Sequence, residues 1–342
     1  MTPPTVLISR SDNLGDCVLT LPLAGYLKST LPGVRVLWLG QPSTEPLVRC
    51  SAHVDDFLKL DDVLRSPERL TAAGVTTLLH VYPNAPLAWA ARKVQVPQRV
   101  GTSHRWYHWP TCTHRVHFSR RRSELHEAQL NFHLLAPLLP QAPGWAQAQP
   151  AQALSAYFGL TRLPRLGLSV GNYLRPDRFR LVLHPKSRGS AREWPLSFYR
   201  ALAQSLPTEK VQILVTGTAE EGTRMRAEDP AFLALPQVTD LTGKLSLEEL
   251  IALLSNVDGL VACSTGPLHI AAALGKPVLG LYPVIRPMHA GRWGPIGPRT
   301  HVLNAPKPTC SDCRGARRCA CMEQIGLQTV YEQIMQWVGR SQ

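Results

Sequence analysis

The chain has 342 residues, of which 44% are hydrophobic and 18% charged. This composition fits a folded protein with room for two domains, and it excludes both a disordered chain and a single small core. No apolar run approaches the ~18 residues of a membrane helix, and the first apolar stretch is short and followed by an early Asp, so we expect a cytoplasmic protein without a signal peptide. The net charge of +13 implies an anionic partner: nucleic acid, anionic lipid, or a phosphorylated or acidic substrate.

The first half opens with the pattern of a parallel α/β sheet. Residues Thr5–Ser9 and 34–39 are predicted strands on either side of a helix from Asp16 to about Leu31, which Pro22 should kink. A strand, a turn, a helix and a second strand in this order predict a right-handed βαβ unit. Asp16 in the first helical turn is suited either to stabilise the helix N-terminus or to act as a general base at the carboxyl edge of the sheet.

A basic and aromatic region follows two more strands (57–60 and 78–81) and a helix (86–94). From 99 to 126 it holds six arginines and five histidines against the single acid Glu124, with Trp106, Tyr107 and Trp109 interleaved. Three interpretations remain open: a binder of single-stranded nucleic acid, a site for an anionic sugar, and a solvated surface loop. Residues 124–139 are predicted to be helical.

The pattern restarts after residues 141–171, which are rich in Pro, Ala and Gln and indicate a domain junction. Strands are predicted at 181–183 and Val211–Val215, and helices at 195–205 and 246–256. The second half is therefore expected to be a second α/β domain. Neither half contains GxGxxG, which weighs against a dinucleotide redox cofactor.

The stretch 258–283 predicts a strand, a tight loop, a helix and another strand. Pro267 suits the first turn of the helix, Ser264 or Thr265 its cap, and Gly275 its end. Such a helix start binds phosphate, although the pattern alone fits a βαβ crossover without a ligand equally well. Lys186 lies in a cationic loop after the preceding strand, at the same expected edge, and the cations of that loop favour a diphosphate site. These cations are Lys186, Arg188 and Arg192.

Two further features leave alternatives open. After the turn 216–218, Glu220 or Glu221 could accept hydrogen bonds from a ribose or cap the next helix. The spacing C-x2-C-x5-C-x-C at Cys310, Cys313, Cys319 and Cys321 is compatible with zinc, but reduced thiols in a long loop are the favoured interpretation. Residues 327–338 are predicted to form a terminal amphipathic helix.

Four segments in order resemble glycosyltransferase family 9, the ADP-heptose:lipopolysaccharide heptosyltransferases. The segments are SRSDNLGDCVLTLPLAGYLK (9–28), HPKSRGSAREWP (184–195), DLTGKLSLEEL (240–250) and CSTGPLHIAAALGKPVLGLYP (263–283), and the Cys-containing loop 310–322 is also similar. The resemblance implies GT-B architecture, with two Rossmann-like domains facing across a cleft. It assigns 1–170 to the acceptor side and 171–325 to the nucleotide sugar, with the helix 326–342 crossing back to the first domain.

The resemblance also implies an inverting transfer without a metal ion or cofactor, to a lipopolysaccharide-like anionic acceptor at the inner membrane face. Asp16 matches the family's catalytic Asp and would deprotonate the acceptor. The donor set would be Lys186, Ser187, Arg188, Arg192, Glu221, Leu245, Ser264, Thr265, Gly266, Pro267 and His269. Candidates for acceptor binding are Asn13, Gly15, Arg99, Arg105 and Arg120.

One departure affects the sugar. Family members usually carry an Asp at the position of Ser264, where it is placed to hold donor hydroxyls, so the identity of the sugar is open. Two other functions are alternatives to a transferase: a nucleic-acid-binding protein using 99–126, and a nucleotide-sugar hydrolase or epimerase of GT-B fold that needs no acceptor. Both leave the four ordered segments unexplained.

Overall fold

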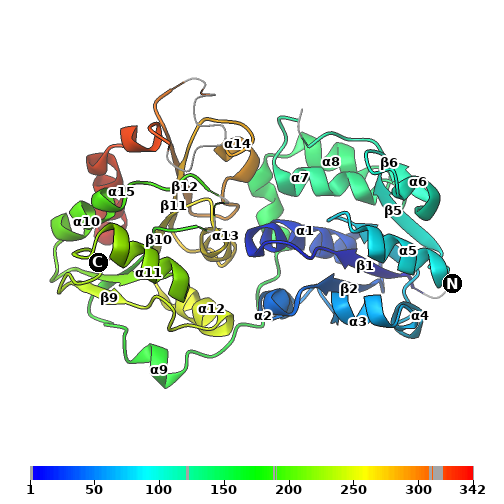
Figure 1. Ribbon diagram of the computed structural model, residues 1–342, viewed down its shortest axis with the longest axis horizontal. Coiled ribbons are helices and arrows are strands. Elements are labelled where there is room, and N and C mark those ends of the chain that lie inside the picture. Colours follow the sequence, from blue (N-terminus) through cyan, green and yellow to red (C-terminus); the bar gives the residue numbers. More distant parts are fainter. Residues whose placement is uncertain are drawn as a thin grey trace. The chain divides into compact units, whose positions relative to one another are not determined.

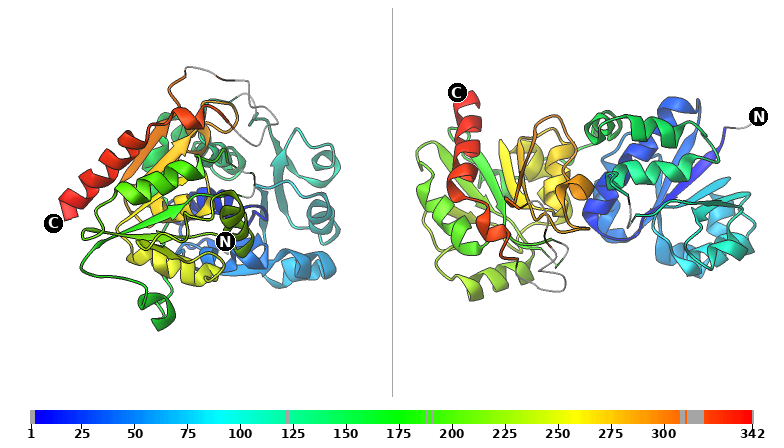
Figure 2. Two further views of the ribbon diagram at one scale, coloured as in Figure 1. Left: turned by 60° about the vertical axis from the view of Figure 1, so that its left-hand side comes forward. Right: turned by 90° about the horizontal axis from the view of Figure 1, so that it is seen from above.

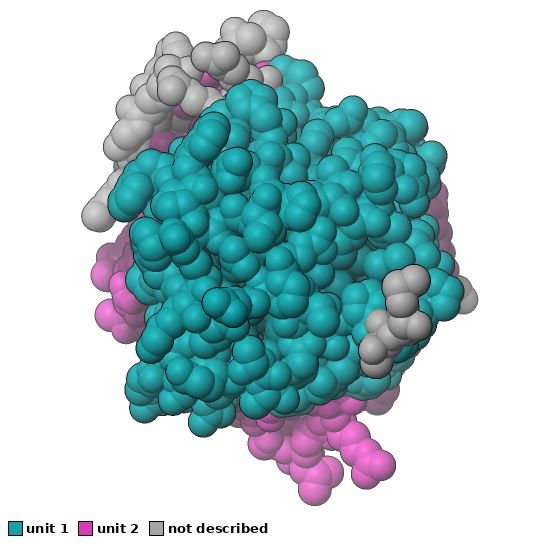
Figure 3. Space-filling model, turned by 90° about the vertical axis from the view of Figure 1, so that its right-hand side faces the viewer, with its two compact units in different colours: residues 1–162 teal, residues 163–342 magenta. Residues whose placement is uncertain are grey.

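The computed structural model describes residues 3–120, 123–187, 189, 191–307, 310 and 319–341. The chain divides into two compact units, residues 1–162 and 163–342, which Figure 3 shows in two colours. Both units consist of a parallel sheet with helices, and each is described by itself.

Unit 1 contains a six-stranded sheet in the order β3-β2-β1-β4-β5-β6, with every neighbouring pair parallel. Its strands are β1 (Thr5–Ser9), β2 (Arg35–Gly40), β3 (Asp56–Lys59), β4 (Thr77–His80), β5 (Gln98–Thr102) and β6 (His114–Val116). The central strand β1 is buried along its whole length, as its continuous apolar run predicts. Successive strands are added on one side of β1 as far as β3 and then on its other side from β4 onward. The carboxyl ends of β1 and β4 therefore form the switch point of the sheet.

Helices cover both faces of this sheet (Figure 1). The helices of unit 1 are α1 (Leu14–Thr30), α2 (Glu45–Arg49), α3 (Leu60–Arg65), α4 (Glu68–Ala72), α5 (Ala85–Lys93), α6 (His108–Thr111), α7 (Glu127–Asn131) and α8 (Ala142–Ala148), with short 3-10 turns η1 (Pro42–Thr44), η2 (Phe132–Leu135) and η3 (Ala151–Tyr157). Leu7, Leu37 and Leu78 of the sheet share one hydrophobic cluster with side chains of α3 and α5. Helix α1 packs against α7 and η3.

Unit 2 repeats the same topology, in the order β12-β11-β10-β7-β8-β9, again with every neighbouring pair parallel. Its strands are β7 (Phe179–His184), β8 (Val211–Val215), β9 (Val238–Asp240), β10 (Gly259–Cys263), β11 (Val278–Tyr282) and β12 (Thr300–Asn304). The switch point of this sheet therefore lies between β7 and β10.

Several helices of unit 2 begin and end close to their predicted bounds. They are α9 (Leu168–Gly171), α10 (Leu196–Ser205), α11 (Ala219–Glu228), α12 (Leu247–Asn256), α13 (Gly266–Ala273), α14 (Ala290–Trp293), η4 (Met322–Gln324) and α15 (Leu327–Ser341). Thr218 and Ser246 form capping boxes at α11 and α12. Gly275, just past α13, has φ +74°, a conformation that glycine adopts without strain.

The last helix packs in unit 2. Val330, Ile334 and Trp337 of α15 are buried in the cluster that also holds Leu181 of β7 and Leu202 of α10. Both views in Figure 2 show this red helix beside the elements of unit 2. The apolar stripe of α15 is thus satisfied within its own unit.

Strands β5, β6, β9 and β12 were not predicted from the sequence, and two helices of unit 1 differ from their predicted bounds. The helix expected over 124–139 begins at Glu127, where His126 caps it, and continues only as α7 and η2. Pro137 explains the early end, because proline lacks the N–H of a continuing helix. Helix α1 begins at Leu14, two residues before the predicted start, and Asp16 remains in its first turn. None of the described helices is long and apolar enough to cross a bilayer.

Candidate active site

The candidate residues gather at the switch point of each sheet. In unit 1, Arg10 follows β1 directly, and Asp16 lies in the first turn of the helix that comes next. In unit 2, Lys186 and Ser187 follow β7, and Ser264 and Thr265 follow the neighbouring strand β10. Ligands of open α/β sheets bind at these carboxyl ends.

Asp16 belongs to a buried network of opposite charges. Arg10 is 4% exposed, and its guanidinium donates hydrogen bonds to Asp12 (2.6 Å) and Asp16, and more distantly to Glu127 (3.4 Å). Glu127 also accepts from Arg120 (2.9 Å). The Asp16 side chain keeps 13% of its surface exposed, so it is mostly but not completely enclosed.

Opposing effects act on the pKa of Asp16. Burial raises this pKa, Arg10 lowers it, Glu127 raises it again, and a hydrogen bond from Asn13 lowers it. Burial likewise raises the pKa of the neighbouring Asp12 to about 6, against the lowering effect of Arg10. A carboxylate with a raised pKa is a better proton acceptor, which suits a general base.

The predicted acceptor residues separate into three groups. Asn13, Gly15 and Arg120 lie in or beside the Asp16 network. Arg105 is exposed in the loop after β5. Arg99 lies near the start of β5, away from the carboxyl edge, and its guanidinium donates to the carbonyls of Thr111 (2.6 Å) and Val96. Arg99 therefore lies apart from the other candidates.

In unit 2, the start of helix α13 has the features of a phosphate site. Thr265 is the N-cap residue, and Pro267 occupies the first turn. The Thr265 hydroxyl makes no cap hydrogen bond and has no partner among the described residues, although the residue is only 7% exposed. A buried hydroxyl without a described partner at a helix N-terminus, where the first N–H groups have no partner within the helix, indicates a place for an anionic ligand.

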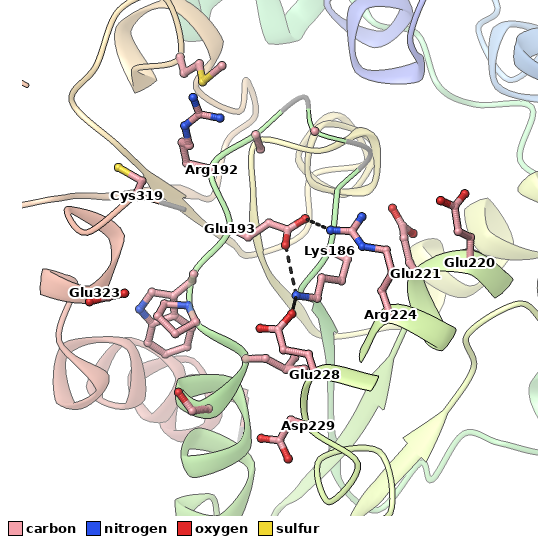
Figure 4. A pocket seen from close by; sticks show the side chains of 17 residues that line it. Lys186, Arg192, Glu193, Glu220, Glu221, Arg224, Glu228, Asp229, Cys319 and Glu323 are labelled. Carbon is pink, nitrogen blue, oxygen red and sulfur yellow. Dashed lines mark hydrogen bonds and ion pairs between the residues drawn. The ribbon is translucent and has the colours of Figure 1, made fainter. Parts of the chain in front are cut away.

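A cavity of about 980 Å³ lies beside β7, and Figure 4 shows its charged lining. The Lys186 ammonium donates to Glu193 (3.2 Å) and Glu228 (2.5 Å). Glu193 also accepts from the backbone N–H and hydroxyl of Ser187 (2.8 and 3.2 Å) and forms an ion pair with Arg224 (3.6 Å). Glu193 therefore occupies donors that would otherwise be available to an anion.

The remaining predicted donor residues have different surroundings. Arg192 and Glu221 line the cavity, and the Glu221 carboxylate accepts from the Thr218 N–H (2.8 Å) as part of the α11 capping box. His269 is buried in α13, while Leu245 is half-buried in the loop before α12. Neither Leu245 nor the segment 264–269 lines the cavity. Arg188 lies outside the described residues.

The cysteine loop is described only in part. The thiol of Cys321 lies 3.3 Å from that of Cys310, and Cys319 lines the cavity. Cys313 falls outside the described residues, so binding of zinc by all four cysteines stays a hypothesis. Within the described ranges, no three His, Cys, Asp or Glu side chains are placed to hold a metal ion.

Sequence reasoning missed several charged residues of these sites. Arg10 and Glu127, which are 117 positions apart, meet beside Asp16. Glu193 and Glu228 both accept from Lys186, and Arg224 pairs with Glu193. One signal was available for Arg10, since a charge directly after a buried strand marks the carboxyl edge of a sheet. The partners of these ion pairs became visible only in the folded chain.

Comparison with known proteins identifies the family. The model of glycosyltransferase family 9 (heptosyltransferase) matches residues 60–321. A Haemophilus influenzae protein named as a glycosyltransferase is 27% identical over 303 residues, covering 85% of this chain and 86% of its own. Lipopolysaccharide heptosyltransferase 1 of Escherichia coli is 23% identical over 320 residues, covering 88% and 94%.

The fold comparison agrees with the sequence comparison. The structure of the E. coli ADP-heptose lipopolysaccharide heptosyltransferase II superposes with a TM-score of 0.75 over 99% of both chains, at 18% identity. The two sheets in Rossmann order are those of the GT-B class. These matches do not favour the nucleic-acid-binding or acceptor-free alternatives. The chain belongs to glycosyltransferase family 9, the heptosyltransferase family, and is a glycosyltransferase.

Proposed function

We propose that this enzyme transfers heptose or a related sugar from an ADP-linked donor to an anionic, lipopolysaccharide-like acceptor, with inversion and without a metal ion. The observation that carries this proposal is the start of α13 at the switch point of unit 2. There the buried Thr265 hydroxyl without a described partner lies beside the helix N-terminus. The names of the E. coli relatives supply the candidate donor and acceptor.

The diphosphate would bind where α13 begins. The N–H groups of Thr265 and Gly266 and the Thr265 hydroxyl would donate to its oxygens, with Arg192 and Ser187 from the loop after β7. Lys186 would add positive charge, in competition with Glu193 and Glu228, which hold it in this structure. These groups would neutralise the leaving diphosphate as its negative charge grows, the part a metal ion plays in other transferases.

The transfer would be one displacement. The ionised Asp16 takes the proton of an acceptor hydroxyl while that oxygen forms a bond to the anomeric carbon of the sugar. The bond from the anomeric carbon to the diphosphate oxygen breaks, and its electron pair leaves with the diphosphate. Asn13, Gly15, Arg105 and Arg120 are the candidates for holding the acceptor, and Arg99 is the weakest because its guanidinium is engaged with carbonyls.

The sugar is the least determined part of the proposal. Ser264 follows β10 at the position where the resemblance implied an Asp. A hydroxyl donates as well as accepts hydrogen bonds and carries no charge, so it would recognise sugar hydroxyls differently from a carboxylate. Leu245 would contact the base, and Glu221 would accept hydrogen bonds from the ribose.

A thermal-shift screen of nucleotide sugars tests the donor directly, because a ligand that binds only the folded state raises the melting temperature with its occupancy. We expect ADP and ADP-heptose to raise it, and UDP and GDP to have little effect. A melting temperature that stays the same with every nucleotide and nucleotide sugar of the screen would contradict the donor assignment. Comparison of the native enzyme with Ser264→Asp across several ADP-sugars then shows whether this position selects the sugar.

A further inference from the structure

An exposed group of tryptophans and arginines on unit 1 is not used by the proposed chemistry. Its members are Trp89 and Arg92 of α5, Trp106 and Trp109 in and before α6, and Arg115 of β6; we call it the Trp–Arg surface. Trp106 is 75% exposed, Trp109 60% and Trp89 44%. These three indoles are among only seven large hydrophobic side chains that are exposed in the described part of the chain.

Contacts between neighbouring elements hold this surface in place. Helices α5 and α6 lie side by side (Figure 1). The Arg92 guanidinium donates to the Pro110 carbonyl (2.8 Å), and the Trp109 indole N–H donates to the Ser103 carbonyl (3.1 Å). Arg115 donates to the Trp109 carbonyl (3.3 Å). The surface is therefore built by defined hydrogen bonds between α5, α6 and β6.

The sequence around the Trp–Arg surface carries basic residues and no acidic ones. No Asp or Glu occurs between Arg69 and Ser123, a stretch that carries Arg92, Lys93 and Arg115 among its cations. These three side chains are exposed. Among the described residues, no carboxylate forms an ion pair with any of them. Charges without internal partners are available to an external anion.

The arrangement of rings and cations favours lipid over nucleic acid. The Arg115 guanidinium lies 4.7 Å from the Trp109 ring centroid, and that of Arg92 lies 5.5 Å from the Trp89 ring centroid. A guanidinium over a ring covers one of the two faces on which a base could stack. Indoles beside arginines instead suit the bilayer interface, where the ring enters the headgroup region and the cation meets lipid phosphate.

We propose that the Trp–Arg surface docks the enzyme on an anionic lipid bilayer. This inference rests on the proposed function, because a lipopolysaccharide-like acceptor is held in a membrane and the enzyme would meet it there. Binding to lipid itself requires neither the donor nor the acceptor. Hydrophobic insertion and charge attraction are two signals that together give stable but reversible attachment.

Sedimentation of the full chain with vesicles tests this surface. We expect binding to an equal mixture of phosphatidylcholine and phosphatidylglycerol, weaker binding at high salt, and little binding to phosphatidylcholine alone. The double variant Trp106→Ala/Trp109→Ala should lose binding by about tenfold or more, since both rings leave the interface. Arg92→Gln and Arg115→Gln should each lose about fivefold, the effect of one cation near an anionic leaflet.

Tyr173 provides a matched control, because it is an exposed aromatic (38%) in unit 2 with the Lys244 ammonium 5.9 Å from its ring centroid. Tyr173→Ala should leave vesicle binding unchanged. Brominated lipid should quench the tryptophan fluorescence of the native chain and quench the double variant much less. Equal vesicle binding by the native chain and the double variant would overturn the proposal, as would binding to single-stranded oligonucleotide in preference to vesicles. Failure of ADP to raise the melting temperature while vesicles still bind would contradict the donor assignment and leave this inference standing.

Discussion

The two switch points share one topology and carry opposite chemistry. In unit 1, the charges after β1 pair with one another around Asp16, and Arg10 is almost fully enclosed. In unit 2, the segment after β10 presents a helix start and a hydroxyl without a described partner. The two sheets have the same strand order, and the residues that follow each strand decide whether its carboxyl edge carries a buried charge network or an open helix start.

Replacement of the central carboxylate should have the largest effect. In Asp16→Asn the amide fits the same space but cannot accept the acceptor's proton, so we expect kcat to fall by about 10²–10⁴, the usual contribution of a general base. Binding of ADP, measured by calorimetry, should change little because the nucleotide is assigned to unit 2. Turnover within a few-fold of the native enzyme would remove Asp16 from its assigned role.

Acid should act strongly on unit 1 through His80, the last residue of β4. Burial, followed by the charges of His108 and Arg99, lowers the pKa of His80 to about 3. The unfolded histidine binds a proton below its ordinary pKa near 6.5, while the folded one stays neutral to about pH 3. Below pH 6.5 the contribution of His80 to the free energy of unfolding therefore falls by about 1.4 kcal/mol per pH unit as the pH approaches 3.

The variant His80→Gln removes this proton linkage, so its unfolding free energy should fall less steeply with acid than that of the native chain. Urea unfolding between pH 7 and pH 4 measures the two slopes. His104→Gln, on an exposed loop of the same unit, is the matched histidine-to-glutamine control for the substitution itself. Parallel curves for the native chain and His80→Gln would contradict the assignment.

The switch point of unit 2 can be tested by removing one oxygen. Thr265→Val keeps the shape of the side chain, and it deletes a buried hydroxyl that has no described partner. The unliganded protein should be as stable as the native one or more stable, while the affinity for ADP should fall about tenfold through the loss of a charge-assisted hydrogen bond. Thr218→Val is the contrasting control: its hydroxyl caps α11 by accepting from the Glu221 N–H (3.2 Å), so it should lower stability.

An unchanged affinity for ADP in Thr265→Val would separate the start of α13 from the diphosphate. A loss of stability in the same variant would show instead that the hydroxyl has a structural role. The two measurements therefore distinguish a ligand contact from a packing contact, which the geometry of the hydroxyl alone does not.

The strands at the two switch points follow from local sequence, whereas the charge networks do not. Val211–Val215 was predicted with its observed bounds, because a mostly apolar, β-branched run between turn residues indicates a buried strand. The position of Asp16 in a first turn at the sheet edge followed from the same order of elements. Arg10 and Glu127 meet only through the packing of α1 on α7, and no local pattern specifies which distant charges a fold brings together.

The cationic loop after β7 shows the same limit at shorter range. The composition of 184–195 predicted an anion site, yet Glu193 and Glu228 hold Lys186 in the unliganded chain. Glu193 is a neighbour in sequence, whereas Glu228 comes from the end of α11, 42 positions away. The composition therefore placed these cations at the sheet edge, whereas the carboxylates that pair with Lys186 became apparent only in the folded chain.

The network around Asp16 provides the finest test, because its two buried partners act on the base in opposite directions. Arg10 lowers the pKa of Asp16 and Glu127 raises it. Arg10→Gln should therefore move the acid limb of the kcat profile to higher pH, since a base of higher pKa is protonated sooner. Glu127→Gln should move the limb to lower pH, because the carboxylate no longer faces a second negative charge. A purely structural role for the two residues would lower kcat at every pH without displacing the limb, and shifts in the same direction would show that the pairing acts on the fold rather than on the proton of Asp16.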